Sequence, residues 1–128
     1  MSDRPVMLIT GASSGIGATT ARLAVENGYR VALAARRRDP LEELATELGG
    51  PQTALALSCD VSEWDQVRAA VDATVDVFGR LDVAFANAGF GAVRGLLNEP
   101  PEHWRSMVLT NVLGPALLAR AAVPALED

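Results

Sequence analysis

The sequence predicts an α/β protein built on a parallel, doubly wound sheet with strand order 3-2-1-4. Apolar runs typical of buried strands alternate with amphipathic stretches typical of helices, and only short breaks separate them. The run at 30–35 is continuously apolar after its first residue, as expected for a strand with both faces covered. At 128 residues the chain has the size of one domain, so we expect a single domain over 1–128.

The first strand is predicted at 5–10 and the following helix at 15–27. Three glycines lie in or just after the turn between them, and each has an expected role. Gly11 permits the tight turn, Gly15 lets a pyrophosphate approach, and Gly17 lets the helix lie flat on the strand. Because the turn N–H groups and the helix dipole both attract anions, this unit predicts a phosphate site. A βα turn without any ligand is the alternative.

The second unit comprises the strand at 30–35 and a helix that stops at 49–51, before a third strand at 53–58. We expect this helix to begin with Asp39 as its N-cap and Pro40 as its first helical residue.

Ser62 and Asp65 resemble a capping box, which predicts a third helix that Gly79 ends. A fourth strand is predicted at 81–86, and a connecting segment then leads from residue 92 to a long last helix.

Composition excludes several classes of protein. The net charge is −5, which argues against nucleic-acid binding, and a single cysteine, Cys59, excludes a disulfide within the chain. We find no signal peptide and no apolar run of membrane-spanning length, so we expect a cytoplasmic protein that does not contact membranes. All eleven basic residues are arginine, and Tyr29 is the single tyrosine. A mechanism that needs a lysine cannot be carried out by these residues alone.

Four motifs follow the predicted strands in order: Thr10-Gly11-x-x-x-Gly15-x-Gly17, Asp60-Val61, Asn87-Ala88-Gly89, and Asn111 within Thr110-Asn111-Val112. Together they resemble the N-terminal half of a short-chain dehydrogenase/reductase. One departure is Ala86, which stands where that family has the first asparagine of Asn-Asn-Ala-Gly. The resemblance covers the whole chain and implies a Rossmann-type sheet, truncated before strands five to seven.

The resemblance also implies a function. Members of this family transfer a hydride between C4 of a nicotinamide cofactor and a small carbonyl or alcohol substrate. Their substrate-orienting serine and their Tyr-x-x-x-Lys pair would follow the region that this chain covers, so we expect the chain alone to be inactive. The last helix forms part of the dimer interface in the resembled family, which implies a homo-oligomer or self-association.

The end of the second strand bears on the choice of cofactor. NAD-binding proteins usually place a carboxylate there for the ribose 2′-hydroxyl, whereas an arginine accommodates a 2′-phosphate. Here Ala35 is followed by three arginines at 36–38, and no carboxylate occurs before Asp39. We therefore expect NADP(H), with Arg36 and then Arg37 as its ligands. A solvated loop of charges is the alternative, which leaves NAD(H) open.

The carboxyl ends of parallel strands meet at one edge of a sheet, and ligands bind in the crevice there. Asp60 can accept a hydrogen bond from an adenine amino group, or it can cap the next helix. Asn87 can fix its loop through backbone groups, and Gly89 keeps side chains away from the ribose. The predicted cofactor-binding residues are Gly11, Ser13, Ser14, Gly15, Ile16, Gly17, Arg36, Arg37, Asp60, Val61, Asn87, Ala88 and Gly89.

Asn111 is the one predicted catalytic residue. Pro115 lies four residues further on and cannot donate to the Asn111 carbonyl, so we expect a kink that leaves this carbonyl free. In the resembled family the carbonyl holds a water of a proton relay; an ordinary kink is the alternative. We expect His103 at the surface, with a general-base role as the alternative, and we predict no metal site.

Two other functions stay open. One is a non-catalytic NADP-binding or interaction module, and the other is a degenerate subunit that pairs with a complete partner. Neither the substrate nor the direction of the reaction can be inferred from these residues.

Overall fold

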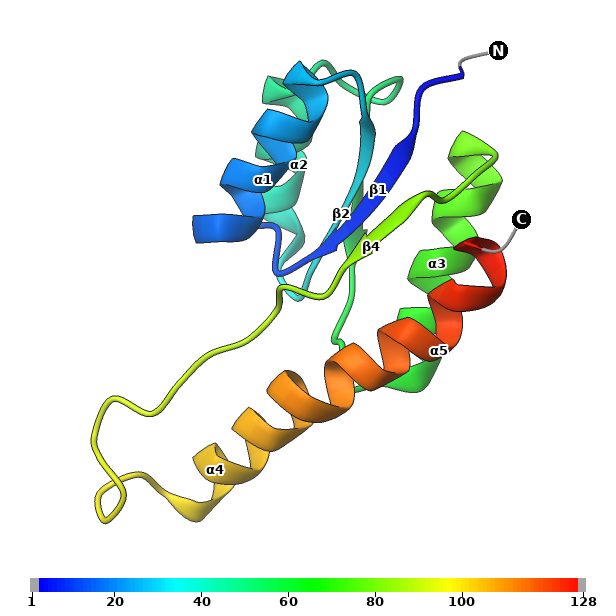
Figure 1. Cartoon of the computed structure of the whole chain (residues 1–128). Helices are drawn as coiled ribbons and strands as arrows, with labels where there is room; N and C mark the ends of the chain where they lie inside the picture. The colour runs from blue at the N-terminus through cyan, green and yellow to red at the C-terminus, as the bar shows by residue number, and fades with distance from the viewer. Residues whose placement is uncertain (1–2, 127–128) are drawn as a thin grey trace.

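The computed structural model describes residues 3–126, and four parallel strands form its centre (Figure 1). The strands are β1 (Val6–Thr10), β2 (Arg30–Ala35), β3 (Ala54–Ser58) and β4 (Val83–Phe85). Their order in the sheet is β3-β2-β1-β4, and every neighbouring pair is parallel, which confirms the predicted architecture.

Helices cover both faces of this sheet (Figure 1). Alternate strand residues such as Ile9 and Leu33 pack with α1 (Gly15–Glu26) and α2 (Arg38–Glu47). The residues between them, such as Leu8, pack on the opposite face with α3 (Trp64–Phe78) and α5 (Gly114–Leu126). Both faces of β2 are covered by helices, so polar side chains are disfavoured on either face. This explains why the sequence of β2 is continuously apolar after Arg30.

The starts of α2 and α3 differ from the prediction. The N-cap of α2 is Arg37, so Asp39 lies in the first turn, where its charge favours the positive end of the helix dipole. The N-cap of α3 is Glu63, and the expected capping box is absent. Ser62 lies one residue before this N-cap, where its hydroxyl and its N–H both donate to the Asp60 carboxylate.

β4 is three residues long, although a strand over 81–86 was expected. Its pairing with β1 runs from Val83 to Phe85. Beyond it the backbone turns, since the Asn87 N–H donates back to the Phe85 carbonyl at 3.0 Å. The chain therefore leaves the sheet just before the motif at 87–89.

The long last helix has an interruption. α4 (Pro101–Val108) continues into the π-helical segment η1 (Leu109–Leu113) and then into α5. Gly114 donates to the Leu109 carbonyl five residues back, the spacing of a π-helix. This segment lies where Pro115 removes a donor, so the expected disturbance takes the form of a π-bulge.

The helical stretch Pro101–Leu126 corrects one expectation. By length and composition it is apolar enough to cross a membrane, although no run of that kind was expected. This is weak evidence, because core helices of soluble proteins have the same properties. Leu118 and Ala122 are buried against the sheet and α3, as on a helix that packs at the surface of a domain.

Candidate functional site

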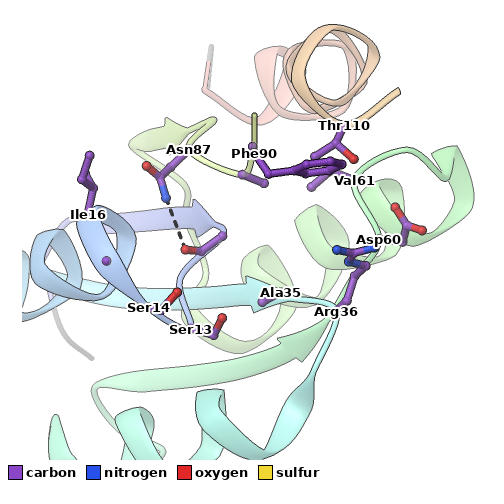
Figure 2. Close-up of a pocket in the computed structure, with 14 residues that line it drawn as sticks. Ser13, Ser14, Ile16, Ala35, Arg36, Asp60, Val61, Asn87, Phe90 and Thr110 are labelled. Carbon is purple, nitrogen blue, oxygen red and sulfur yellow. Dashed lines mark hydrogen bonds between the residues drawn. The ribbon is translucent and has the colours of Figure 1, made fainter. Parts of the chain in front are cut away.

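A cavity of about 500 Å³ opens at the carboxyl ends of the strands (Figure 2). We call it the strand-end cavity. Every predicted cofactor residue lines it except Gly17 and Arg37. Its lining residues are Gly11, Ser13, Ser14, Gly15, Ile16, Ala35, Arg36, Asp60, Val61, Asn87, Ala88, Gly89, Phe90 and Thr110.

The glycine-rich turn forms one wall of this cavity. Gly11 has a φ of 65°, and a Cβ there would lie 2.8 Å from the Cα of Ala88, so only glycine fits. A Cβ on Gly17 would collide with the Gly11 carbonyl and come within 2.7 Å of the Asn87 amide nitrogen. Gly17 is therefore required by the turn and the neighbouring loop, whereas close packing on the strand was expected.

The N-terminus of α1 points its free donors at the cavity. Ser14 is the N-cap residue, yet no side chain caps the helix, and its first turn carries no acidic residue. Gly15 has a φ of 56°, and a Cβ there would meet nothing within 4 Å, which leaves space in front of these N–H groups. The arrangement can receive an anion.

Two side chains tie the ends of β1 and β4 together. The Thr10 hydroxyl accepts hydrogen bonds from the N–H groups of Asn87 and Ala88, both at 3.1 Å. The Asn87 side-chain amide donates to the Gly11 carbonyl at 3.2 Å, the contact drawn in Figure 2. Asn87 thus bonds a backbone group as predicted. The role of Thr10 was missed, although its place directly before Gly11 was the available signal.

Arg36 and Asp60 lie beside each other, on the side of the cavity away from Ile16 (Figure 2). The Asp60 carboxylate accepts hydrogen bonds from the hydroxyl and the N–H of Ser62, at 2.7 and 3.0 Å. These bonds, with a smaller attraction from Arg36, lower the pKa of Asp60. Asp60 does not cap α3, which begins after Glu63, so the structure removes that alternative.

Arg37 lies outside the strand-end cavity. It lines a separate cavity of about 330 Å³ together with Arg38, Asp39 and Pro40. Arg38 is held away from the strand ends by Glu42, at 2.7 Å. Of the three consecutive arginines, Arg36 alone lines the strand-end cavity within the described residues.

Asn111 does not line the cavity but clamps a residue that does. Its side-chain oxygen accepts from the Phe90 N–H at 3.0 Å, and its amide donates to the Phe90 carbonyl at 2.6 Å. A Cβ on Gly89 would lie 2.9 Å from that same oxygen, so glycine leaves room for the clamp. Phe90 and Thr110, which sequence reasoning did not select, complete the wall.

Gly114 was also missed. A Cβ there would lie 2.8 Å from a methyl group of Val61, so this glycine lets the start of α5 close against the cavity wall. A glycine inside an otherwise apolar helix was the signal that could have identified it.

Two reactive side chains do not line the cavity. Cys59 is buried at the end of β3, and burial raises the pKa of its thiol to about 11, which agrees with a structural role. His103 is half-buried, although it was expected at the surface, because its ring packs against Phe90 and Glu99. Within residues 3–126 no acidic, cysteine or histidine cluster could hold a metal ion.

The chain matches the short chain dehydrogenase family over residues 5–128. It is 35% identical to dehydrogenase/reductase SDR family member 11 of Gallus gallus over 126 residues. That alignment covers 96% of this chain and 49% of the relative, so the chain spans about half the length of this curated relative.

Solved structures give the same result. The fold superposes on a 3-ketoacyl-(acyl-carrier-protein) reductase of Brucella melitensis, complexed with NADH, with a TM-score of 0.89 and 35% identity. It also superposes on a metagenomic short-chain oxidoreductase in complex with NADP, with a TM-score of 0.85 and 37% identity. The alignments cover 94% and 95% of this chain, but 49% and 56% of those chains. The chain belongs to the short-chain dehydrogenase/reductase family.

Proposed function

We propose that residues 1–128 form the dinucleotide-binding domain of an NADP(H)-dependent oxidoreductase. The whole enzyme would transfer a hydride between the nicotinamide and a small carbonyl or alcohol substrate. The observation that carries the proposal is the strand-end cavity, which joins a glycine-rich turn, an uncapped helix N-terminus and Arg36 in one space. Its volume suits an extended ligand with several polar groups.

Each wall of the cavity has a part in this proposal. The N–H groups at the start of α1 bind the pyrophosphate, and the positive φ of Gly11 and Gly15 brings the backbone close to it. Ile16 is an apolar side chain with 71% of its surface exposed at the rim, so a bound ligand would cover it. Asp60 accepts a hydrogen bond from the adenine amino group, because the bonds from Ser62 use one oxygen of its carboxylate and leave acceptor capacity on the other.

The preference for NADP(H) rests on charge at the end of β2. Ala35 supplies no carboxylate to repel a 2′-phosphate, and the Arg36 guanidinium offers paired donors to bind one. Relatives of known structure carry NADH in one case and NADP in another, so the likeness itself favours neither cofactor. Arg37 plays the smaller part, since it faces the neighbouring cavity.

We propose that catalysis needs residues beyond these 128. The chain contains no lysine, and Tyr29 precedes β2 at the opposite end of the sheet. The serine and the Tyr-x-x-x-Lys pair would come from a continuation of the chain. Asn111 contributes by holding Phe90, while its own carbonyl remains the proposed site for a relay water.

Titration of the purified chain with NADPH and NADH, followed by the fluorescence of the nicotinamide, tests the binding. We expect NADPH to bind more tightly, and Arg36→Asp to weaken it by about 100-fold while NADH binding is kept or improved. Arg68→Asp makes the same charge change on the exposed face of α3 and should alter neither affinity. Absence of any NADPH signal at millimolar concentration would refute the proposal.

A non-catalytic NADP-binding module is the second candidate, because the strand-end cavity would serve cofactor binding without catalysis equally well. A degenerate subunit that pairs with a complete partner makes the same prediction for the isolated chain. Sequencing the downstream reading frame separates the enzyme from both alternatives, because only an enzyme would continue into a serine strand and a Tyr-x-x-x-Lys helix.

We further propose a cytoplasmic protein that self-associates through the last helix. Val108, Val112 and Val123 are exposed on that helix, and burying such side chains against a second copy is favourable. Light scattering after gel filtration measures the mass. A monomer at micromolar concentration would contradict this part of the proposal.

A further inference from the structure

The segment between β4 and α4 is neither strand nor helix (Figure 1). It reaches the strand-end cavity. Gly89 and Phe90 in this segment line the cavity, so their placement sets the shape of one wall. Irregular backbone of this kind needs side-chain contacts to hold one conformation. Those contacts show which residues outside the cavity control it.

Glu99 is the most buried acidic side chain of this region, with 1% of its surface exposed. One carboxylate oxygen accepts hydrogen bonds from the N–H groups of Val93 and Arg94, at 2.8 and 2.7 Å. Burying a carboxylate is costly unless its oxygens receive hydrogen bonds, and these two amides supply them. The result is a loop closed on itself around one carboxylate.

Gly95 lets the chain make this closure. Its φ of 86° turns the backbone, and its carbonyl accepts from the N–H groups of Asn98 and Glu99, at 3.3 and 3.2 Å. The same turn brings Glu99 back onto Val93 and Arg94. These amides lower the pKa of Glu99, and the attraction of His103 adds to the effect, so the group stays ionised.

The other oxygen of Glu99 faces α4. It lies 3.6 Å from Nε2 of His103, which is too long for a hydrogen bond, and the two side chains form an ion pair when the imidazole is protonated. The His103 ring packs edge-on against Phe90, with 5.2 Å between ring centroids. Phe90 is therefore held twice, by His103 at its ring and by Asn111 at its backbone.

We propose that Glu99 is a positioning residue that places Phe90 in the wall of the strand-end cavity. It acts through the Val93 and Arg94 amides on one side and through His103 on the other. No atom of Glu99 lines the cavity, so the effect on a ligand is indirect. The inference rests on the proposed function in so far as that ligand is NADP(H).

Amide hydrogen exchange on the free chain tests the placement without any cofactor. Glu99→Ala should speed exchange at the Val93, Arg94 and Phe90 amides by about tenfold, because the loop opens locally. Glu99→Gln keeps an acceptor oxygen for the two amides and loses the attraction to His103, so we expect an increase of about threefold at Phe90. Glu102→Ala, an exposed change one turn away on α4, should leave all three amides unchanged.

NADPH titration of the same variants tests the effect on binding. We expect the Kd to rise about tenfold for Glu99→Ala and about threefold for Glu99→Gln, and to stay unchanged for Glu102→Ala. A Phe90 amide that exchanges at the wild-type rate in Glu99→Ala overturns the inference, as does an unchanged NADPH Kd in that variant. Should Glu99→Ala fail to fold, Glu99→Gln decides by the same criteria.

The two proposals fail in different ways. If the wild-type chain binds no NADPH, the proposed function is refuted, while the exchange rates still judge the positioning of Phe90. If NADPH binds and Glu99→Ala matches Glu102→Ala in exchange and affinity, only the role of Glu99 is refuted.

Discussion

The two ends of the sheet use the same residue type in opposite ways. At the amino end Arg30 begins β2 with 8% of its surface exposed, lies 4.9 Å from the Phe78 ring centroid and donates to the Arg4 and Phe78 carbonyls. At the carboxyl end Arg36 follows β2, is exposed, and forms no ion pair within the described residues. Six positions separate an arginine that is part of the packing from one that is free to bind.

The same contrast holds for the carboxylates. Asp82 at the amino end is satisfied by the Val6 N–H at 2.8 Å and by two contacts from Arg80, at 2.7 and 2.9 Å. Within the described residues the Asp60 carboxylate, at the carboxyl end, accepts hydrogen bonds only from Ser62, and only at one oxygen, so it keeps acceptor capacity toward the cavity. At the amino end both oxygens of the Asp82 carboxylate have hydrogen-bond partners, which stabilises the fold. At the carboxyl end the Asp60 carboxylate keeps acceptor capacity that a ligand can use. Variants at the two ends should therefore separate stability from binding.

The largest effect is expected at the carboxyl end, from Gly17→Ala. The added methyl group would collide with the Gly11 carbonyl and the Asn87 amide, so the turn must shift. We expect NADPH affinity to fall by at least about 100-fold, or about 2.7 kcal/mol, with some loss of stability. Gly91→Ala is the control, because its methyl group meets nothing within 4 Å. Equal NADPH affinities for the two variants would show that the turn is more tolerant than its geometry implies.

The next effect belongs to the amino end. Arg30→Met removes two hydrogen bonds to carbonyls and the contact with the Phe78 ring, and it should cost about 2 kcal/mol of unfolding free energy. Urea denaturation measures this loss. NADPH affinity measured well below the denaturation midpoint should stay within about twofold. A large change in NADPH affinity would show that the amino end of the sheet also contributes to binding.

A smaller effect concerns pH. Hydrogen bonds from Arg80, then from the Val6 N–H, hold the pKa of Asp82 below its usual range. Its contribution to stability is therefore complete above the unfolded-state pKa, about 4, and is lost as the pH falls through the folded-state value. Asp82→Asn should lower stability at pH 7 and flatten its decline below about pH 4, as followed by circular dichroism. A decline as steep as in the wild type would assign the acid sensitivity to other groups.

The smallest effect should come from Arg37→Ala. This side chain lies outside the strand-end cavity, so NADPH affinity should fall by less than about threefold at moderate salt. Fluorescence titration of Arg37→Ala beside Arg36→Ala compares the two positions directly. A larger loss for Arg37 would reverse the order in which the geometry ranks these arginines.

Local patterns predicted most of the fold because each rests on contacts close in sequence. Both boundaries of β2 were predicted correctly, because its apolar run lies between Gly28 and the arginines at 36–38, which mark where the strand begins and ends. Helix starts were less predictable, as Ser62 and Asp39 show. Whether such a side chain caps a helix depends on which other donors and acceptors lie beside it.

Some residues of the cavity wall could be predicted from the sequence, and others could not. Gly11, Asp60 and Asn87 follow strands, and parallel strands end at one edge, so the sequence implied their meeting. Phe90 and the Glu99 carboxylate belong to the segment between β4 and α4, which has no regular pattern. Their places come from the hydrogen bonds of Asn111 and Glu99, which cross the loop to reach the backbone.

The sequence by itself determined the order of the elements, the glycine-rich turn and the absence of a carboxylate at the end of β2. These follow from periodicity and residue type, which act over a few neighbouring residues. Only the tertiary structure decided that Gly17 is required by Asn87, that Arg36 rather than Arg37 faces the cavity, and that Glu99 lies buried behind Phe90. Those facts depend on close contacts between segments far apart in the chain, and such contacts cannot be predicted from the residues of one segment alone.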